Sequence, residues 1–262
     1  MIITSRQNPL IVRLAKLADR KHRKNEGLFL AEGVKLSEEA AKSGTVEYLL
    51  VTEENEDSPV VDAVSENGGE IITVSQEVLE KVSTESAPQG MIAVCRMADT
   101  PHDSADSAEI AEGESILILD RVRDPGNLGT VMRSAEAFGN VRLLTSGCAD
   151  VYNPKTVRGS MGAVFRVRTM DFPTTADAVE FAKSAGYRVL GAALDNTAVK
   201  LGEYALSSSD AVIIGTEGKG ISDDVLAMCD GKIYIPMTGG ESLNCSVAAS
   251  VIMWEMFRQN GR

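Results

Sequence analysis

An arginine within a loop-and-helix segment has the chemistry to handle a negatively charged group. In DRVRDPGNLGTVMRSAEAFG, residues 120–139, an apolar strand ends at Asp120 and a Pro-Gly turn follows. A helix is expected from near Leu128 to just before Gly139, with Arg133 little more than one turn inside it. Free N–H groups at a helix start and a fixed guanidinium fork suit a phosphate or a developing oxyanion. A purely structural role, with Arg133 capping the helix or pairing with an acidic neighbour, fits the sequence equally well.

A glycine-rich turn follows another apolar strand in IIGTEGKGISDD. The strand is expected to end at Gly215 and a helix to start at Ser222, next to two aspartates that suit its positive end. Glycines at Gly215, Gly218 and Gly220 let the backbone approach a ligand closely. Their order matches neither the dinucleotide fingerprint nor a P-loop. Glu217, an acid among glycines, could bind ribose hydroxyls or orient a basic side chain, although a turn without a ligand is an equal alternative.

A third loop, IPMTGGESLNCSVAAS, connects a strand that ends at 235–237 to the last helix, expected from about Ser242. Asn244 and Ser246 would then lie in the first helical turn, near unpaired backbone N–H groups. Helix capping would explain the presence of Ser242, but it would not require Asn244 as well.

The elements that must position these loops form two α/β parts. The chain has 262 residues, 44% hydrophobic and 24% charged, which is enough for two modest domains. A polar, acidic stretch at 97–113 predicts a linker between domains at 1–96 and 114–262. In the first part we expect helices at 9–25 and 33–42 and strands from Val46, Glu70 and Gly90.

The second part alternates short apolar runs with helical stretches, which predicts a parallel sheet covered on both faces. Ligands in such sheets lie outside the carboxyl ends of the strands. The strands are expected in SILILD, VRLLTS, FRVRTM, YRVLGAAL, AVIIG and KIYIPM. The last helix, 242–259, is apolar nearly all round, which favours burial against a partner subunit and hence a homodimer.

Composition excludes several classes of protein. Two histidines, His22 and His102, cannot build a multi-histidine metal site, and four cysteines without a CxxC pair argue against zinc or disulfides. We therefore expect no metal. No apolar run reaches the length of a membrane span, and the start lacks the layout of a secretory signal, which predicts a cytoplasmic protein.

The charge is unevenly distributed along the chain. The formal net charge is −12, yet residues 1–25 hold seven basic side chains against one acidic one. A basic arm on an acidic body suits local RNA docking, with Arg13, Lys16, Arg20 and Lys24 as contacts, although a charge run is by default a solvated face.

Together the three loops closely resemble the motifs of the SpoU (TrmH-like) ribose 2′-O-methyltransferases of the SPOUT class. NLGTVMR, GTEGKGIS and IPMTGGESLNCSVAAS match three motifs in order and spacing, and YNPKTVRGSMGAVFRV is also similar to the family. The likeness covers residues 114–262, and SRQNPLIVRLAKL, EGLFLAEGVKL and SAPQGMIAV look like the family's small RNA-binding domain.

The resemblance implies a trefoil-knotted α/β domain, a homodimer and bound S-adenosylmethionine. It makes Arg133 the catalytic arginine, helped by Asn127, and places Glu217 and Asn244 in support of the site. Cofactor contacts are expected from a set in the second and third motifs: Gly215, Glu217, Gly218, Ile235, Leu243 and Ser246.

A guanidinium with a pKa above about 12 is a poor proton acceptor, so we expect Arg133 to stabilise the emerging alkoxide and hold a phosphate. Ribosomal RNA is favoured as substrate, and transfer RNA and an antibiotic-resistance role are alternatives. Other classes stay open: a non-catalytic RNA-binding or assembly factor of the same fold, and a nucleotide-dependent oxidoreductase, which the glycine order disfavours.

Overall fold

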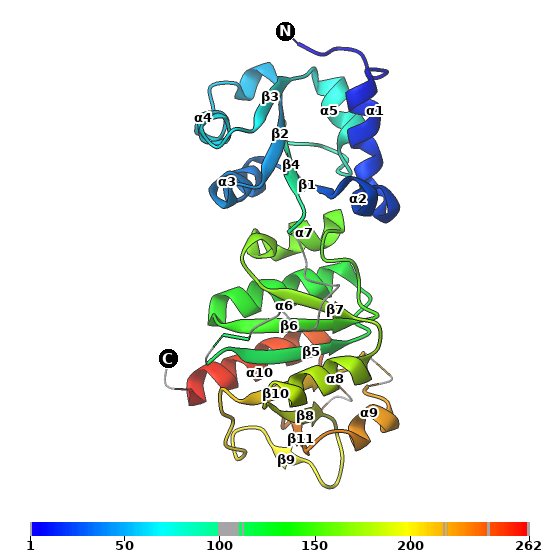
Figure 1. The fold of residues 1–262 in the computed structure, drawn as a ribbon, viewed down its shortest axis with the longest axis vertical. Coiled ribbons are helices and arrows are strands. Elements are labelled where there is room, and N and C mark those ends of the chain that lie inside the picture. Colours follow the sequence, from blue (N-terminus) through cyan, green and yellow to red (C-terminus); the bar gives the residue numbers. More distant parts are fainter. Residues whose placement is uncertain are drawn as a thin grey trace. The chain divides into compact units, whose positions relative to one another are not determined.

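The chain folds into two compact units (Figure 1). The computed structural model describes residues 2–98, 110–111, 113–216, 218, 220–239 and 242–260. One unit comprises Met1–Asp99 with Asp150–Phe165, and the other comprises Thr100–Ala149 with Arg166–Arg262. Residues 150–165 lie inside the second predicted domain but pack with the first unit. Most of the predicted linker at 97–113 lies outside the described residues.

The first unit is a four-stranded sheet with helices on both faces. The strand order is β1-β4-β2-β3, with β2 and β3 parallel and the other pairs antiparallel. Phe29 and Ala31 of β1 face one apolar cluster while Leu28 and Leu30 face another, as the alternation of a strand requires. The elements are β1 (Leu28–Glu32), α3 (Val34–Ser43), β2 (Val46–Val51), α4 (Pro59–Glu66), β3 (Glu70–Thr73), α5 (Gln76–Val82), β4 (Met91–Arg96) and α7 (Pro154–Ser160).

The single helix predicted at 9–25 is wrong, because the chain breaks into α1 (Pro9–Ala15), a 3-10 turn (Lys16–Ala18) and α2 (Arg20–Glu26). Asp19 is extended and its side chain accepts a hydrogen bond from the Lys21 N–H, which starts α2. The buried Arg23 guanidinium donates to the carbonyls at 17 and 18, each at 2.8 Å, and pairs with Asp150 at 2.6 Å. Arg23, one of the basic side chains of residues 1–25, therefore stabilises the fold.

The second unit is built on a seven-stranded sheet in which every described pair is parallel, in the order β7-β6-β5-β10-β8-β11-β9. This confirms the predicted α/β class. The strand predicted in FRVRTM begins later, at Thr169, and the two-residue β9 was not predicted. The strands are β5 (Ser115–Asp120), β6 (Val141–Ser146), β7 (Thr169–Phe172), β8 (Arg188–Ala192), β9 (Val199–Lys200), β10 (Asp210–Ile214) and β11 (Gly231–Tyr234).

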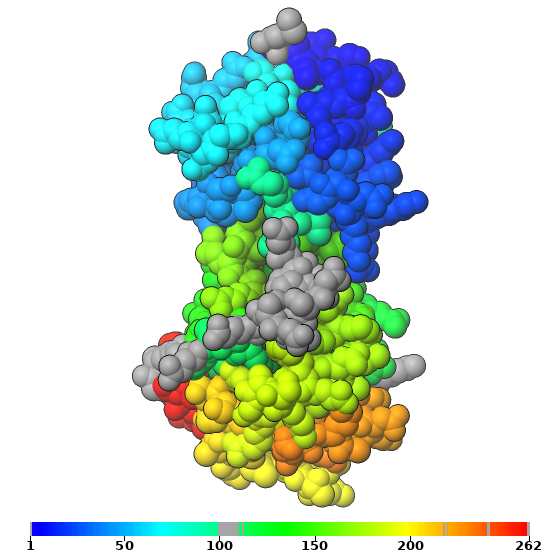
Figure 2. Space-filling view, in the orientation of Figure 1, coloured from blue at the N-terminus to red at the C-terminus, as the bar shows by residue number. Residues whose placement is uncertain are grey.

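Helices cover both faces of this sheet, because its central strands are buried along their whole length. α8 (Thr175–Ser184) and α9 (Asp223–Ala227) share one apolar cluster with alternate residues of β5 and β10. They lie next to each other at the surface of this unit, yellow-green and orange in Figure 2. α6 (Pro125–Phe138) packs along α10 (Cys245–Gln259) over the sheet (Figure 1).

In the part of the chain that the structure describes, no helix is both long and apolar enough to cross a bilayer. The trefoil knot implied by the resemblance stays a prediction.

Candidate active site

Three loops meet at the carboxyl edge of the parallel sheet. The first follows β5 and leads into α6, the second follows β10, and the third joins β11 to α10. β5 and β10 are neighbours, and β8 alone separates β10 from β11. Parallel strands end at the same edge, so loops far apart in sequence come together where such sheets bind ligands.

The larger of two hollows at this edge has a volume of about 470 Å³, which is within the range of small-molecule sites. Four residues expected to contact the cofactor line it together, two from the glycine turn and two from the third loop: Gly215, Gly218, Ile235 and Leu243. Aliphatic side chains such as Ile221, Leu226 and Met237 complete much of the wall. An apolar slot with backbone polar groups at its rim suits an adenosine.

Gly215 has no space for a side chain. A Cβ atom there would lie 2.3 Å from the carbonyl carbon of Gly220, which is backbone and cannot move aside cheaply. The turn is closed by the Gly220 N–H, which donates to the Thr216 carbonyl at 3.0 Å. Gly218 and Gly220 have φ of +86° and +61°, the region that glycine adopts most readily. The close packing explains why the second motif needs glycine at its first position.

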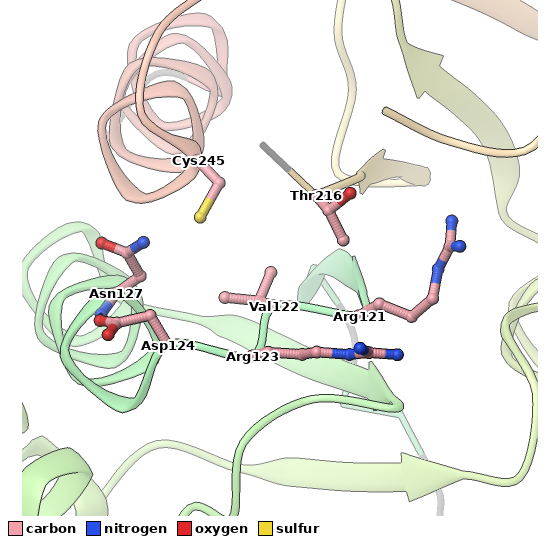
Figure 3. Close-up of a pocket in the computed structure, with 7 residues that line it drawn as sticks. All are labelled: Arg121, Val122, Arg123, Asp124, Asn127, Thr216 and Cys245. Carbon is pink, nitrogen blue, oxygen red and sulfur yellow. The ribbon is translucent and has the colours of Figure 1, made fainter. Parts of the chain in front are cut away.

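A smaller hollow of about 370 Å³ lies against the larger one, since Thr216 and Cys245 line both. Figure 3 shows Asp124 and Asn127 on one side, from the start of α6, and the side chains of Arg121 and Arg123 extending on the other. Sequence reasoning missed both arginines, although the string DRVRDP between a strand and a helix carried the signal.

Arg121 is held in an unusual conformation beside this hollow. Its φ is +57°, which is strained for a residue with a side chain. The guanidinium forms a two-pronged contact with Asp120, at 2.9 and 2.7 Å, and this carboxylate raises the pKa of Arg121. Asp120 is buried and also accepts from the Thr175 hydroxyl at 2.7 Å. The pair fixes the chain at the point where it leaves β5.

The first and third motifs are joined by a polar cluster. The Asn244 amide donates to Asn127 Oδ1 at 3.2 Å, and Ser246 Oγ lies 3.5 Å from the same oxygen. Ser246 Oγ also donates to Asn244 Oδ1 at 2.6 Å. The structure therefore brings three of the expected site residues together, although Asn127 lies more than a hundred positions before the other two.

The expected start of the last helix is wrong. α10 begins at Cys245, and Asn244 is its N-cap, with Oδ1 accepting from the backbone N–H groups of Ser246 and Val247. Asn244 thus does the capping that the sequence assigned to Ser242, and its amide group remains for Asn127. Asparagine is among the strongest N-cap residues, so this role could have been weighed.

Arg133 lies outside both hollows. α6 begins at Pro125, earlier than expected, because Asp124 caps it by accepting from the Asn127 N–H at 2.9 Å. Arg133 is therefore more than two turns inside the helix, about 9 Å along its axis and about 120° around it from Asn127. Its side chain is exposed, and within the described part of the chain it has no hydrogen bond or ion pair. The neighbouring Ser134 contacts Ser250 of α10 at 2.7 Å.

Other expected site residues have different positions. Glu217 lies outside the described residues. Arg13 pairs with Glu26 at 2.8 Å, whereas Lys16, Arg20 and Lys24 are exposed on the first unit. Arg20 and Lys24 are four residues apart on α2 and so share a face. No group of acidic, histidine and cysteine side chains suited to a metal ion occurs among the residues that the structure covers.

Comparisons with known proteins give similarities along the whole chain. The family model of SpoU rRNA methylases matches residues 114–254, and that of an MRM3-like substrate binding domain matches residues 8–93. The 23S rRNA (guanosine(2553)-2′-O)-methyltransferase RlmP of Bacillus subtilis is 34% identical, over 97% of this chain and 98% of its own length.

Two further proteins are similar over nearly their full lengths. The 23S rRNA (uridine(2479)-2′-O)-methyltransferase of Streptomyces viridochromogenes is 31% identical, over 98% of this chain and 92% of its own. A crystal structure of an AdoMet-bound rRNA methyltransferase from Sinorhizobium meliloti superposes with a TM-score of 0.86 at 27% identity, covering 98% of this chain and 97% of the other.

Proposed function

Because this chain belongs to the SpoU rRNA methylase family, we propose that it methylates a ribose 2′-hydroxyl of ribosomal RNA with S-adenosylmethionine as methyl donor. The observation that carries the proposal is the larger hollow, where residues of two family motifs meet beside the Asn127 cluster. Family membership makes the alternative of an oxidoreductase wrong. A ribosomal RNA substrate also favours action in the cytoplasm.

The residues of the larger hollow fit S-adenosylmethionine. The space that a Cβ of Gly215 would fill is occupied by the Gly220 backbone, so glycine at this position lets the turn fold tightly on itself at the wall of the hollow. Ile235 and Leu243 supply apolar contacts, and Gly218 belongs to the same wall. When bound, S-adenosylmethionine would supply an activated methyl group, whose carbon an oxygen nucleophile can attack in line while S-adenosylhomocysteine leaves.

Arg133 is proposed as the residue that stabilises the alkoxide forming at the ribose. A guanidinium acts through its charge and its hydrogen-bond donors and has no acceptor for the proton. Asn127 is proposed to support the reacting group, held in place by Asn244 and Ser246. Glu217 is proposed to orient groups in the same cleft.

The position of Arg133 favours a site completed by a second copy of the chain. Val247 and Trp254 are 47% and 48% exposed, two turns apart on α10, and Trp254 stacks on Phe257 with 5.8 Å between centroids. Apolar surface of this kind marks interfaces. α6, which carries Arg133, packs along the same helix. We infer a homodimer in which the α6–α10 layer is the interface and Arg133 serves the partner's hollow.

The first unit is proposed to dock the RNA through Lys16, Arg20 and Lys24, with Arg13 contributing after release from Glu26. Residues 1–96 then act as substrate-binding domain and 114–262 as methyltransferase domain. Exposed cations of this kind contact phosphates irrespective of sequence, which leaves the choice of target to the second domain.

Replacing Arg133 tests the role of its guanidinium. Arg133→Ala should lower kcat on unmethylated ribosomal RNA by about 10²-fold, as expected for a lost oxyanion contact, without changing the dissociation constant of S-adenosylmethionine. Arg133→Lys should also be slow, because an ammonium lacks the planar fork. Arg168→Ala, which removes an exposed arginine elsewhere, is the matched control.

Near-normal turnover of Arg133→Lys, with RNA binding unchanged, would contradict this role. A wild-type chain that binds ribosomal RNA but neither S-adenosylmethionine nor its methyl group would instead favour the non-catalytic assembly factor. Methylation of transfer RNA and not of ribosomal RNA would show that transfer RNA is the substrate.

A further inference from the structure

Two arginines, Arg121 and Arg123, line the smaller hollow, and they differ in their hydrogen bonds and ion pairs. Arg121 is bound on both prongs by Asp120 and also lies 3.5 Å from the Gly220 carbonyl. Arg123 is exposed, lines the same hollow, and has no hydrogen bond or ion pair within the described residues. Arg121 therefore shapes the wall, while the charge of Arg123 is paired with no group among the residues that the structure describes.

The acidic group in this wall is already engaged. Asp124 lies between Arg123 and α6, and its Oδ1 accepts from the Asn127 N–H at 2.9 Å. A carboxylate held at the positive end of a 14-residue helix is partly neutralised by that end. Among the described residues of this wall, the cationic character thus rests on Arg123, and the Thr216 hydroxyl suits a sugar or a base edge.

The two hollows share Thr216 and Cys245, so they are adjacent. A ribose bound in the smaller hollow would consequently lie next to a methyl donor bound in the larger one. The smaller hollow's volume of about 370 Å³ is within the range that takes a small organic group such as a nucleotide.

We propose that the smaller hollow binds the RNA nucleotide that carries the target ribose, and that Arg123 binds a phosphate of this nucleotide. The inference rests on the proposed function, because it assigns a substrate subsite to the same reaction. It adds a substrate-binding residue upstream of the first motif. The guanidinium fork matches a phosphate with two parallel hydrogen bonds, and the exposed position lets RNA enter without a rearrangement of the fold.

The test compares Arg123→Ala and Arg123→Lys with Lys200→Ala, which removes a surface cation on β9 that pairs only with Glu203 in the described chain. Binding of in-vitro-transcribed 23S ribosomal RNA is measured over a series of salt concentrations, and S-adenosylmethionine binding by calorimetry. A single phosphate contact adds about 0.7 to 0.9 to the slope of log affinity against log salt. Arg123→Ala should lose this increment and bind about tenfold more weakly at low salt.

Arg123→Lys should retain the slope, because it keeps the charge, and Lys200→Ala should change neither quantity. All three variants should bind S-adenosylmethionine as the wild type does. An unchanged slope in Arg123→Ala, or an equal loss in Lys200→Ala, overturns the subsite. So does a loss of S-adenosylmethionine affinity without an effect on RNA. Failure of the wild type to methylate the transcript would contradict the proposed function, while the salt series would still report on Arg123.

Discussion

At the scale of a single residue, a substitution of Gly215 is expected to weaken cofactor binding without affecting RNA binding. Gly215→Ala places a methyl group against the Gly220 backbone, so the turn must open. We expect calorimetry to show at least a tenfold loss of affinity for S-adenosylmethionine, with binding of RNA retained.

Gly239 offers a matched control for that change. It lies in the third loop, where a Cβ meets nothing within 4 Å, and its φ is not in the left-handed region. Gly239→Ala should bind the cofactor normally. Equal affinities for the two alanine variants would mean that the turn at Gly215 does not form the cofactor wall.

Asn244 illustrates how far residue types alone carry a prediction. The sequence placed Asn244 and Ser246 near a helix start, the family resemblance added Asn127, and the structure joins the three by hydrogen bonds. It could not say that Asn244, and not Ser242, caps α10, because both residue types cap well and only packing selects the start.

At the scale of elements, Cys148 braces the loop that follows β5. Its thiol donates to the Leu119 carbonyl at 3.2 Å and accepts from the Val122 N–H at 3.3 Å. Burial raises the pKa of Cys148 to about 11, whereas an unfolded thiol has a pKa of about 8.5. The unfolded chain therefore loses this proton first as the pH rises.

The contribution of this thiol to stability is complete below pH about 8.5 and is lost as the pH rises through the folded pKa of about 11. Cys148→Ser keeps a donor and an acceptor but does not titrate here. Denaturant unfolding from pH 8 to 11 should show a shallower fall in the free energy of unfolding for this variant, by at most about 1.4 kcal/mol per pH unit. Parallel curves would show that the thiol ionises as readily in the folded chain.

Strands with uninterrupted apolar runs were predictable, because burial on both faces leaves a plain signal, as in β5 and β10. Elements whose ends are set by tertiary contacts could not be predicted from the sequence. The break between α1 and α2 depends on the buried Arg23, which meets Asp150 from a distant part of the chain. The helical periodicity of apolar residues at 9–25 gave no indication of that ion pair.

At the scale of the whole molecule, the position of Arg133 was the largest departure from expectation. The family resemblance made Arg133 the catalytic arginine, yet its side chain is exposed and lines neither hollow. A helix period could have shown that Asn127 and Arg133 face different directions. In the proposed homodimer, what lies opposite Arg133 depends on a second copy, which one sequence does not encode locally.

Complementation between two inactive variants tests this arrangement. Arg133→Ala lacks the guanidinium, and Gly215→Ala lacks the cofactor wall. If Arg133 serves the partner's hollow, one site of each mixed dimer is intact and the other lacks both groups, so random mixing should restore about a quarter of wild-type activity.

Analytical ultracentrifugation should accompany this assay, since Trp254→Glu is expected to yield monomers and to abolish the recovery. No recovery in mixtures that are shown to exchange subunits would place Arg133 and the cofactor in the same protomer.

The most direct measurement follows a labelled methyl group from S-adenosylmethionine into unmodified ribosomal RNA, with nuclease digestion and mass spectrometry of the nucleosides. The label should appear in one 2′-O-methylated nucleoside at one position, and should fall with Gly215→Ala when S-adenosylmethionine is limiting. Label on a base, or no transfer by a chain that binds both S-adenosylmethionine and the RNA, would contradict ribose methylation.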